Sequence, residues 1–454
     1  MHSYILKLLV GRSLSPPFLF YISCFYAVWE FSHSFIHFYF ISSAISNLIH
    51  VIIIIFAPMQ LSQRLSRISE PQTIKMAKMS RELKAQGINV IDLSIGEPDF
   101  RTPEHVCNAA IDAIKNGYTK YPPVAGIPEL KAAICTKLKR DNNLSYIPAE
   151  VMVSTGAKQA IANAILCLID AGDEAIIPTP FWVTYGAQVS LAGGVVKYIP
   201  CSIENNFKLT PQQLEANISD KTKLFIFSSP CNPTGSVYSR TELAALAEVF
   251  KRYPNITIIS DEIYEYINYI GGHESIAQFP ELRDQVVVIN GMSKGFAMTG
   301  WRLGYMAGPQ ELIQACEKLQ GQFTSGANSI TQRASVVALT SDLAPTYAMR
   351  EAFHERRDYI IVALQQMPGV KVNMPDGAFY AFPNISSFFG KTDGNTVITD
   401  DESFSMYLLH KANVATVWGS AFGAGDCIRI SFAAAMPLLK EAMERVGKAL
   451  TELK

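Results

Sequence analysis

Short apolar runs alternate with longer amphipathic stretches along most of the chain. Runs rich in β-branched residues occur at 151–153, 174–177, 195–199, 224–227, 256–259, 286–289 and 303–306. Helical patterns lie between several of them, as at 157–169 and 240–252. This alternation predicts βαβ units, and therefore an α/β fold with a mostly parallel sheet flanked by helices. Crossovers between such strands are right-handed almost without exception.

The pattern changes after about residue 335. A long charged helix through Arg350 and Arg357 leads to shorter predicted strands, and an amphipathic helix ends the chain. These features predict a smaller second domain of α+β type, with no sharp linker before it. We expect strands at 378–382, 414–417 and 427–432, and a last helix at 436–452. The predicted division is an N-terminal arm with part of the small domain (59–102), a large domain (103–335) and a small domain (336–454).

Residues 1–58 differ from the rest in composition. Only Lys7, Arg12 and Glu30 are charged there, and the uncharged run after Glu30 is long enough to span a bilayer. A membrane anchor is therefore one interpretation. However, Ser, His and Asn interrupt the run, and no cleavage pattern of a signal peptide follows it. We favour the alternative, in which the start is extended upstream and ordinary globular sequence begins at Met59.

Charge and cysteine content narrow the classes of function. The 39 basic and 40 acidic side chains give a formal net charge of -1, so no nucleic-acid partner is predicted. The charges that bind a substrate must therefore be local. Eight cysteines are scattered without a C-x-x-C pair, which predicts neither a metal site nor a disulfide framework. A reducing, cytoplasmic location fits this pattern.

Lys294 follows the predicted strand 286–289, and ligands bind at the carboxyl ends of strands in open α/β sheets. Desolvation and cationic neighbours would lower the pKa of its amine, which suits a nucleophile. A solvated loop lysine is the simpler alternative, so the surrounding sequence decides. Residues 291–304 read GMSKGFAMTGWRLG. This segment resembles the cofactor-lysine signature of class I pyridoxal-phosphate-dependent aminotransferases of the prokaryotic aspartate aminotransferase type.

The resemblance covers essentially all of 59–454 and implies the type I fold of pyridoxal-phosphate transferases, with a seven-stranded sheet in the large domain. It implies that Lys294 forms a Schiff base with pyridoxal 5'-phosphate. It also implies that Ser293 and Arg302 hold the cofactor's phosphate. An arginine suits that role because its guanidinium offers a fork of donors to a dianion.

Asp261 and Tyr264 stand in the segment SDEIY, directly after the predicted strand 256–259. By the resemblance, Asp261 pairs with the pyridine nitrogen and keeps the ring an electron sink. Tyr264 corresponds to the tyrosine that hydrogen-bonds the cofactor's phenolic oxygen. The simpler alternative for Asp261 is a helix N-cap, a position that aspartate favours.

Asn232 lies in the tetrapeptide NPTG, where proline and glycine by themselves indicate only a tight turn. The resemblance assigns Asn232 to the cofactor's phenolic oxygen and the substrate carboxylate. Gly156, Ala157 and Lys158 open a predicted helix, and free N–H groups at a helix start bind phosphate well. The resemblance assigns this turn to the cofactor phosphate, and Lys158 also to the substrate's distal carboxylate. A plain strand-to-helix turn with a solvated lysine is the alternative.

Four further residues take their roles from the resemblance. Trp182 corresponds to the aromatic residue that stacks on the pyridine ring beside the substrate, although core packing is its simpler role. Tyr121 corresponds to a tyrosine given to the neighbouring subunit's phosphate, which implies a homodimer with shared active sites. Gly96 corresponds to a glycine whose backbone meets the substrate. Arg429 corresponds to the arginine that binds the α-carboxylate, and an edge-strand arginine in water is the alternative.

The implied activity is transamination in two half-reactions, in which an amino acid and a 2-oxo acid are the substrates. We expect ping-pong transfer from aspartate to 2-oxoglutarate. The alternatives are another donor such as alanine or an aromatic amino acid, a lyase or synthase that uses the same cofactor, and a non-catalytic sensor. Relatives that aminate prephenate carry a basic residue before a Pro-Ser-Ala-Thr-like stretch. Residues 68–73 read ISEPQT, without that basic residue, which argues against prephenate but leaves it among the alternative partners.

Overall fold

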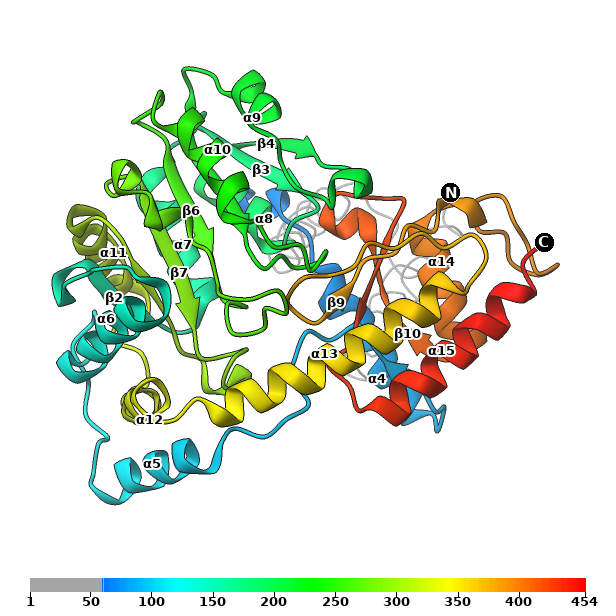
Figure 1. Cartoon of the computed structure of the whole chain (residues 1–454), viewed down its shortest axis with the longest axis horizontal. Coiled ribbons are helices and arrows are strands. Elements are labelled where there is room, and N and C mark those ends of the chain that lie inside the picture. The colour runs from blue at the N-terminus through cyan, green and yellow to red at the C-terminus, as the bar shows by residue number, and fades with distance from the viewer. Residues whose placement is uncertain (1–58, 60) are drawn as a thin grey trace, which may run out of the picture. The chain divides into compact units, whose positions relative to one another are not determined.

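The structure is a computed structural model that describes residue 59 and residues 61–454 (Figure 1). Residues 1–58 lie outside the described part, and with them both interpretations of the apolar extension. Among the described residues, no helix combines the length and the apolar character needed to cross a membrane. Residues Gln63–Lys454 form one compact unit by their contacts.

A seven-stranded sheet forms the centre of this unit. Its strand order is β2-β8-β7-β6-β5-β3-β4, and only β8 runs antiparallel to its neighbours. The predicted mostly parallel sheet is therefore confirmed, with a strand at each of the seven predicted runs. The strands are β2 (Val151–Ser154), β3 (Glu174–Thr179), β4 (Val195–Pro200), β5 (Thr222–Ser228), β6 (Thr257–Asp261), β7 (Val286–Gly291) and β8 (Gly304–Ala307).

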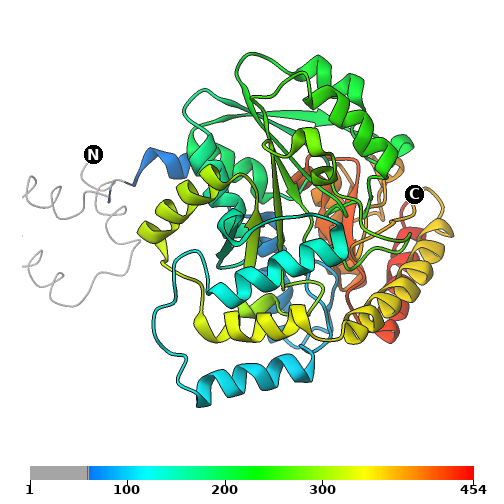
Figure 2. The same cartoon turned by 60° about the vertical axis from the view of Figure 1, so that its left-hand side comes forward.

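Side chains of the inner strands alternate between two apolar cores. In β7, Val286 and Val288 belong to one core, whereas Val287 and Ile289 belong to the other, and all four are fully buried. Burying each such side chain contributes about 1.5–3 kcal/mol. Helices cover both faces (Figures 1 and 2). One face packs against α7 (Ala157–Leu168), α8 (Thr184–Ala192) and α11 (Gln310–Phe323), and the other against α6 (Pro128–Asn142), α10 (Arg240–Phe250) and α12 (Ser329–Thr340). Helix α5 (Glu104–Lys115) packs on α12, outside this layer.

Two small sheets stand apart from the central one. The three-stranded sheet has the order β11-β12-β9, and the two-stranded sheet pairs β1 with β10 in parallel. Their helices are α13 (Ala344–Gln365), α14 (Asp401–Tyr407) and α15 (Met436–Thr451). The strands are β1 (Ile91–Asp92), β9 (Tyr380–Ala381), β10 (Val414–Ala415), β11 (Val417–Trp418) and β12 (Ile428–Ser431).

The prediction of one strand at 414–417 was wrong. Two strands occupy this region and pair in different sheets, with Thr416 between them. The predicted strand 378–382 is also shortened to two residues in β9. Apolar periodicity does not report which strand is the pairing partner. Two short strands that belong to different sheets were therefore predicted as one.

The N-terminal part of the described chain packs against its C-terminal part. Strand β1 pairs with β10, and Met76 of α4 (Gln72–Ala85) shares a small core with Trp418. In Figure 1, α13 runs from the side of α12 to the side of α15. Because Gln63–Lys454 forms one unit by contacts, the predicted domain boundaries stay a prediction.

Candidate active site

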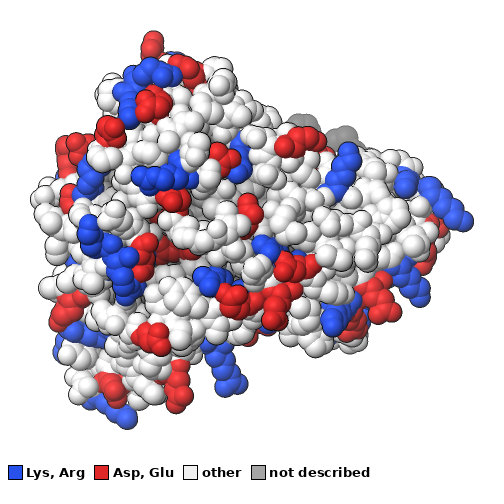
Figure 3. All heavy atoms as spheres, viewed as in Figure 1, with Lys and Arg blue, Asp and Glu red and all other residues white. Residues whose placement is uncertain are grey.

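A pocket of about 500 Å³ lies at the carboxyl ends of the parallel strands, the edge at which α/β sheets bind ligands. Ser228 ends β5, Asp261 ends β6, and Lys294 follows β7. The face of the molecule in Figure 3 shows acidic and basic side chains interspersed. The charges that bind a ligand are therefore sought in the pocket itself. Among the predicted site residues, the pocket is lined by Gly96, Ala157, Lys158, Trp182, Asn232, Asp261, Tyr264, Ser293, Lys294, Arg302 and Arg429.

Lys294 is held at the centre of this pocket. Its Nζ donates a hydrogen bond to the Gly96 carbonyl oxygen at 2.6 Å and lies 5.8 Å from the ring centroid of Tyr264. Removal from water lowers the pKa of Lys294 to about 8, although Glu97 and Asp261 oppose the shift. An amine with this pKa is available in its neutral, nucleophilic form near neutral pH.

Asp261 is buried at the floor of the pocket. Its Oδ2 accepts a hydrogen bond from the Tyr185 hydroxyl at 2.6 Å, and its Oδ1 accepts one from the Ile263 N–H at 3.3 Å. Burial raises the pKa of Asp261 to about 6, against both hydrogen bonds. The alternative of a helix N-cap is wrong, because a turn rather than a helix follows β6.

Arg429 stands in the middle strand of the three-stranded sheet and is 3% exposed. The alternative of an edge-strand arginine in water is therefore wrong. Its Nη1 donates to Asn232 Oδ1 at 3.1 Å and its Nη2 to the Ser94 carbonyl oxygen at 2.5 Å, whereas its buried Nε has no partner. A buried guanidinium without a carboxylate partner, which lines a pocket, is suited to an anionic ligand.

The start of α7 and Arg302 form a cradle for an anion. Gly156 has φ +84°, and a Cβ added there would lie 2.5 Å from Arg302 Nη2. Glycine thus lets the guanidinium lie against the helix start, where the first N–H groups have no intrahelical acceptor. Ala157, Lys158 and Ser293 line the pocket beside them. This donor set fits a phosphate dianion.

Lys158 and Trp182 form another wall. The ammonium of Lys158 lies 4.9 Å from the Trp182 ring centroid. Burial, and then the charge of Arg302, lower the pKa of Lys158. Lys158 is therefore a partly desolvated cation that a ligand carboxylate or phosphate would stabilise.

Several lining residues are not among the predicted ones. Tyr185 lies three residues after Trp182, in the first turn of α8, and only its tertiary contact with Asp261 shows its place in the site. The Tyr380 hydroxyl lies 2.8 Å from that of Tyr264, but its strand is too short for periodicity to orient it. The others are Thr73, Ile74, Ala77, Arg81, Ser94, Ile95, Glu97, Ser228, Ile263 and Thr299.

Tyr121 lies outside the pocket of its own chain. Its side chain is 95% exposed, which is unusual for a large aromatic residue. Gly156 is not among the residues that line the pocket, although Ala157, which follows it, is. The roles of both residues, like those of the other site residues, are taken up as proposals below.

The central sheet, with a lysine, an aspartate and an anion cradle at its carboxyl edge, defines an α/β enzyme that binds a phosphate-bearing ligand. Residues 88–446 match the family model described as aminotransferase class I and II. The chain belongs to this family and is a pyridoxal-phosphate-dependent aminotransferase. The pocket fits that cofactor, because a nucleophilic amine, a buried carboxylate and the phosphate cradle occur together.

Named relatives agree with this assignment. The chain is 48% identical over 389 residues to an aspartate/prephenate aminotransferase of Cereibacter sphaeroides, covering 85% of this chain and 97% of that one. It is 46% identical over 399 residues to a bifunctional aspartate aminotransferase and glutamate/aspartate-prephenate aminotransferase of Petunia hybrida, covering 87% and 83%. The solved aspartate aminotransferase of Rhizobium meliloti superposes with a TM-score of 0.85 at 42% identity, covering 87% and 100%. That of Thermus thermophilus with maleate gives 0.82 at 38%, covering 86% and 100%.

Proposed function

We propose that this enzyme transfers the amino group of aspartate to 2-oxoglutarate, giving oxaloacetate and glutamate by ping-pong kinetics. The observation that carries the proposal is that the pocket is lined, besides the phosphate cradle at Arg302, by two further cations, Arg429 and Lys158, which suit the two carboxylates of aspartate. Relatives named aspartate aminotransferase support this substrate, and one solved relative is described with maleate, a dicarboxylate.

Each side chain has a role in this reaction. When bound, pyridoxal phosphate supplies an electron sink that stabilises negative charge at the substrate's α-carbon. Arg429 and Asn232 bind the α-carboxylate and so orient the Cα–H bond. Lys294 would hold the cofactor through its amine, and the same amine in its free, neutral form would take the proton from Cα. Asp261, held by Tyr185, offers its carboxylate to the cofactor's ring nitrogen.

The remaining contacts hold the cofactor in place. Arg302, Ser293 and the Gly156–Ala157 turn would bind the phosphate, and Trp182 would stack on the ring. Tyr264, with Tyr380 as its hydrogen-bond partner, donates to the cofactor's phenolic oxygen. The backbone of Gly96, whose carbonyl oxygen accepts a hydrogen bond from Lys294, would contact the substrate.

Lys158 distinguishes an acidic substrate from a neutral one. We expect Lys158→Met to lower kcat/KM for aspartate about tenfold to a hundredfold, because an ion pair with the distal carboxylate is lost. The value for alanine should change little. Steady-state assays of both donors with 2-oxoglutarate measure this, with Lys139→Met on the exposed face of α6 as the matched control. An equal loss for both donors would assign Lys158 to the cofactor phosphate alone and refute its role in specificity.

A second candidate acceptor is prephenate. Relatives from Cereibacter sphaeroides and Petunia hybrida carry it in their names. Residues 68–73 contain no lysine, so any recognition of this larger dicarboxylate must come from other cations at the pocket, such as Arg81 on α4. The same assay with prephenate in place of 2-oxoglutarate decides between the two acceptors.

We also propose a cytoplasmic homodimer with shared active sites. The seven cysteines of the described residues are all free, which suits a reducing compartment. Exposed apolar side chains of α5, Ile111 and Ile114, lie close in sequence to Tyr121 and suit a subunit interface.

A further inference from the structure

Tyr380 lies where the proposed cofactor contacts and the proposed carboxylate site meet. It is 1% exposed and lines the active-site pocket. Strand β9 pairs with β12 so that Tyr380 stands opposite Ser431, two residues from Arg429. Side chains two positions apart in a strand point to the same face of the sheet. Tyr380 and Arg429 therefore project from one face of the three-stranded sheet.

The hydroxyl of Tyr380 meets that of Tyr264 at 2.8 Å. Both residues are buried, Tyr264 at 3% exposed. The ring of Tyr264 lies edge-on to the rings of Phe379 and Tyr380, with centroids 5.4 Å and 5.8 Å apart. Two segments that are distant in sequence therefore hold the two hydroxyls against each other in a fixed geometry.

Charged groups surround this pair of hydroxyls. They are Arg429, Asp261 and Lys294. In the part of the chain that the structure describes, their hydrogen bonds all go elsewhere, and neither tyrosine hydroxyl has a partner besides the other. The mutual hydrogen bond is therefore the contact that orients both hydroxyls.

Proton counting gives this hydrogen bond a direction. Each tyrosine hydroxyl has one proton to donate and two lone pairs that accept. If Tyr264 donates its proton to the cofactor's phenolic oxygen, as proposed, it can only accept from Tyr380. Tyr380 is then the donor of the pair. A donor to the oxygen of Tyr264 polarises its O–H bond, which makes Tyr264 a stronger donor in turn.

Gly96 leaves the space that the Tyr380 hydroxyl fills. A Cβ added at Gly96 would overlap the hydroxyl oxygen of Tyr380. The carbonyl oxygen of the same glycine accepts the hydrogen bond of Lys294 Nζ at 2.6 Å. A larger residue at position 96 would therefore displace either Tyr380 or the backbone that holds Lys294.

The ring of Tyr380 supports Arg429. The guanidinium carbon of Arg429 lies 4.6 Å from the Tyr380 ring centroid and 5.0 Å from that of Phe422. Cation–π contacts are strongest where water is excluded, and Arg429 is 3% exposed. The contact uses the face of the guanidinium and leaves its N–H edge free for hydrogen bonds.

We propose that Tyr380 is a positioning residue that serves both halves of the site. Its hydroxyl donates to Tyr264 and so directs the proton of Tyr264 toward the cofactor's phenolic oxygen. Its ring holds the guanidinium of Arg429 in place for the substrate carboxylate. The first part rests on the proposed role of Tyr264, and the second on that of Arg429.

Absorbance of the holoenzyme across a pH series tests the hydroxyl. It reports the pH at which the bound cofactor loses the proton beside its phenolic oxygen. A weaker donor to that oxygen raises this pH, because the oxygen then holds the proton more tightly. We expect an upward shift of about one pH unit in Tyr264→Phe and of about 0.2–0.5 unit in Tyr380→Phe. In the double variant, Tyr380→Phe should add nothing to the shift of Tyr264→Phe.

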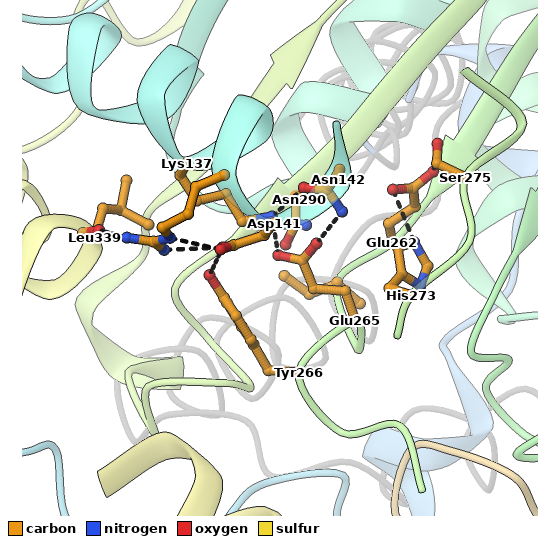
Figure 4. Close-up of polar contacts among 12 residues, drawn as sticks. Lys137, Asp141, Asn142, Glu262, Glu265, Tyr266, His273, Ser275, Asn290 and Leu339 are labelled. Carbon is orange, nitrogen blue, oxygen red and sulfur yellow. Dashed lines mark hydrogen bonds and ion pairs between the residues drawn. The ribbon is translucent and has the colours of Figure 1, made fainter. Parts of the chain in front are cut away.

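Tyr266→Phe is the matched control for the loss of a hydroxyl. Tyr266 follows Tyr264 by two residues, and its hydroxyl donates to Asp141 at 2.6 Å in a polar cluster outside the active-site pocket (Figure 4). This variant should not shift the absorbance change.

The outcomes separate the two proposals. No shift in Tyr380→Phe, a shift that adds fully to that of Tyr264→Phe, or an equal shift in Tyr266→Phe would overturn the donation from Tyr380. No shift in Tyr264→Phe would instead refute the proposed role of Tyr264 itself.

Binding of the dicarboxylate maleate to the holoenzyme tests the ring. Tyr380→Phe keeps the ring, so its Kd for maleate should stay within about twofold of the wild-type value. Tyr380→Leu removes the ring and should raise this Kd about fivefold or more. Tyr380→Met serves the same comparison if the leucine variant does not fold. Equal Kd values with and without the ring would overturn the support of Arg429.

Discussion

Lys294 combines two properties that an exposed lysine cannot have. It is fixed by a hydrogen bond to Gly96, and its environment lowers its pKa to about 8. The cation is the form that burial disfavours, so the neutral amine becomes available well below the usual range of lysine pKa values.

This pKa predicts how the apoprotein captures its cofactor. The rate of the rise in absorbance after mixing with pyridoxal phosphate should increase as pH rises and level off above about 8, because only the neutral amine attacks the aldehyde. Stopped-flow absorbance across a pH series measures the rate. Lys294→Ala should show neither this absorbance nor turnover. A rate that continues to rise toward the pKa of an ordinary lysine would show that Lys294 is solvated.

At the residue scale, the sequence predicted those site residues that stand in long or ordered motifs. Lys294, Asp261 and Arg429 all line the pocket, and their roles in it stay predictions. Tyr185 and Tyr380 could not be found in this way, because each acts through a tertiary contact with a residue far away in sequence. Tyr185, which follows β3, meets Asp261 at the end of β6 with β5 between the two strands, and Tyr380 of another sheet meets Tyr264.

At the scale of elements, the strand-to-helix junctions place the site. Apolar runs gave every strand of the central sheet, because buried parallel strands are continuously apolar. The small sheets were less predictable, since strands of two residues carry almost no periodicity. Thr416 shows the limit, where the chain leaves one sheet and enters another without a change in composition.

The junction between β2 and α7 carries a prediction of its own. Gly156→Ala should weaken pyridoxal phosphate binding about tenfold, because the new Cβ displaces Arg302 from the helix start. Its positive φ should also reduce the free energy of unfolding by about 1–3 kcal/mol. Fluorescence titration and urea denaturation measure the two effects.

Gly172→Ala is the matched control for this junction. Gly172 also has a positive φ, +95°, but an added Cβ would meet nothing within 4 Å. It should lose stability in the same direction without losing cofactor affinity. Equal affinity losses in the two variants would show that backbone strain, and not the contact with Arg302, explains Gly156.

At the scale of the whole molecule, the pocket joins segments from both ends of the described chain. α4 and the turn at Gly96 come from its start, Arg429 from near its end, and the catalytic strands from its middle. The sequence predicted that these distant segments share one pocket only through the resemblance to a known family. Apolar periodicity alone could not predict it, because periodicity does not report which segments meet in the fold.

Tyr121 is the residue that a single chain leaves without a role. Tyr121 is 95% exposed, and its proposed role at the neighbouring subunit's phosphate would require a twofold dimer in which each site is shared. Tyr121→Ala and Lys294→Ala should each impair every site of its own homodimer. A mixed dimer of the two variants should regain one intact site, since the chain with Lys294 then meets the partner that still carries Tyr121.

The expected result is about half the wild-type activity per mixed dimer, by the count of intact sites. Differently tagged chains, unfolded together, refolded and purified through both tags, provide the mixed dimer for steady-state assay. If Tyr121 instead served its own chain, each site of the mixed dimer would lack one of the two residues. Activity no higher than that of the Tyr121→Ala homodimer would therefore refute the shared site.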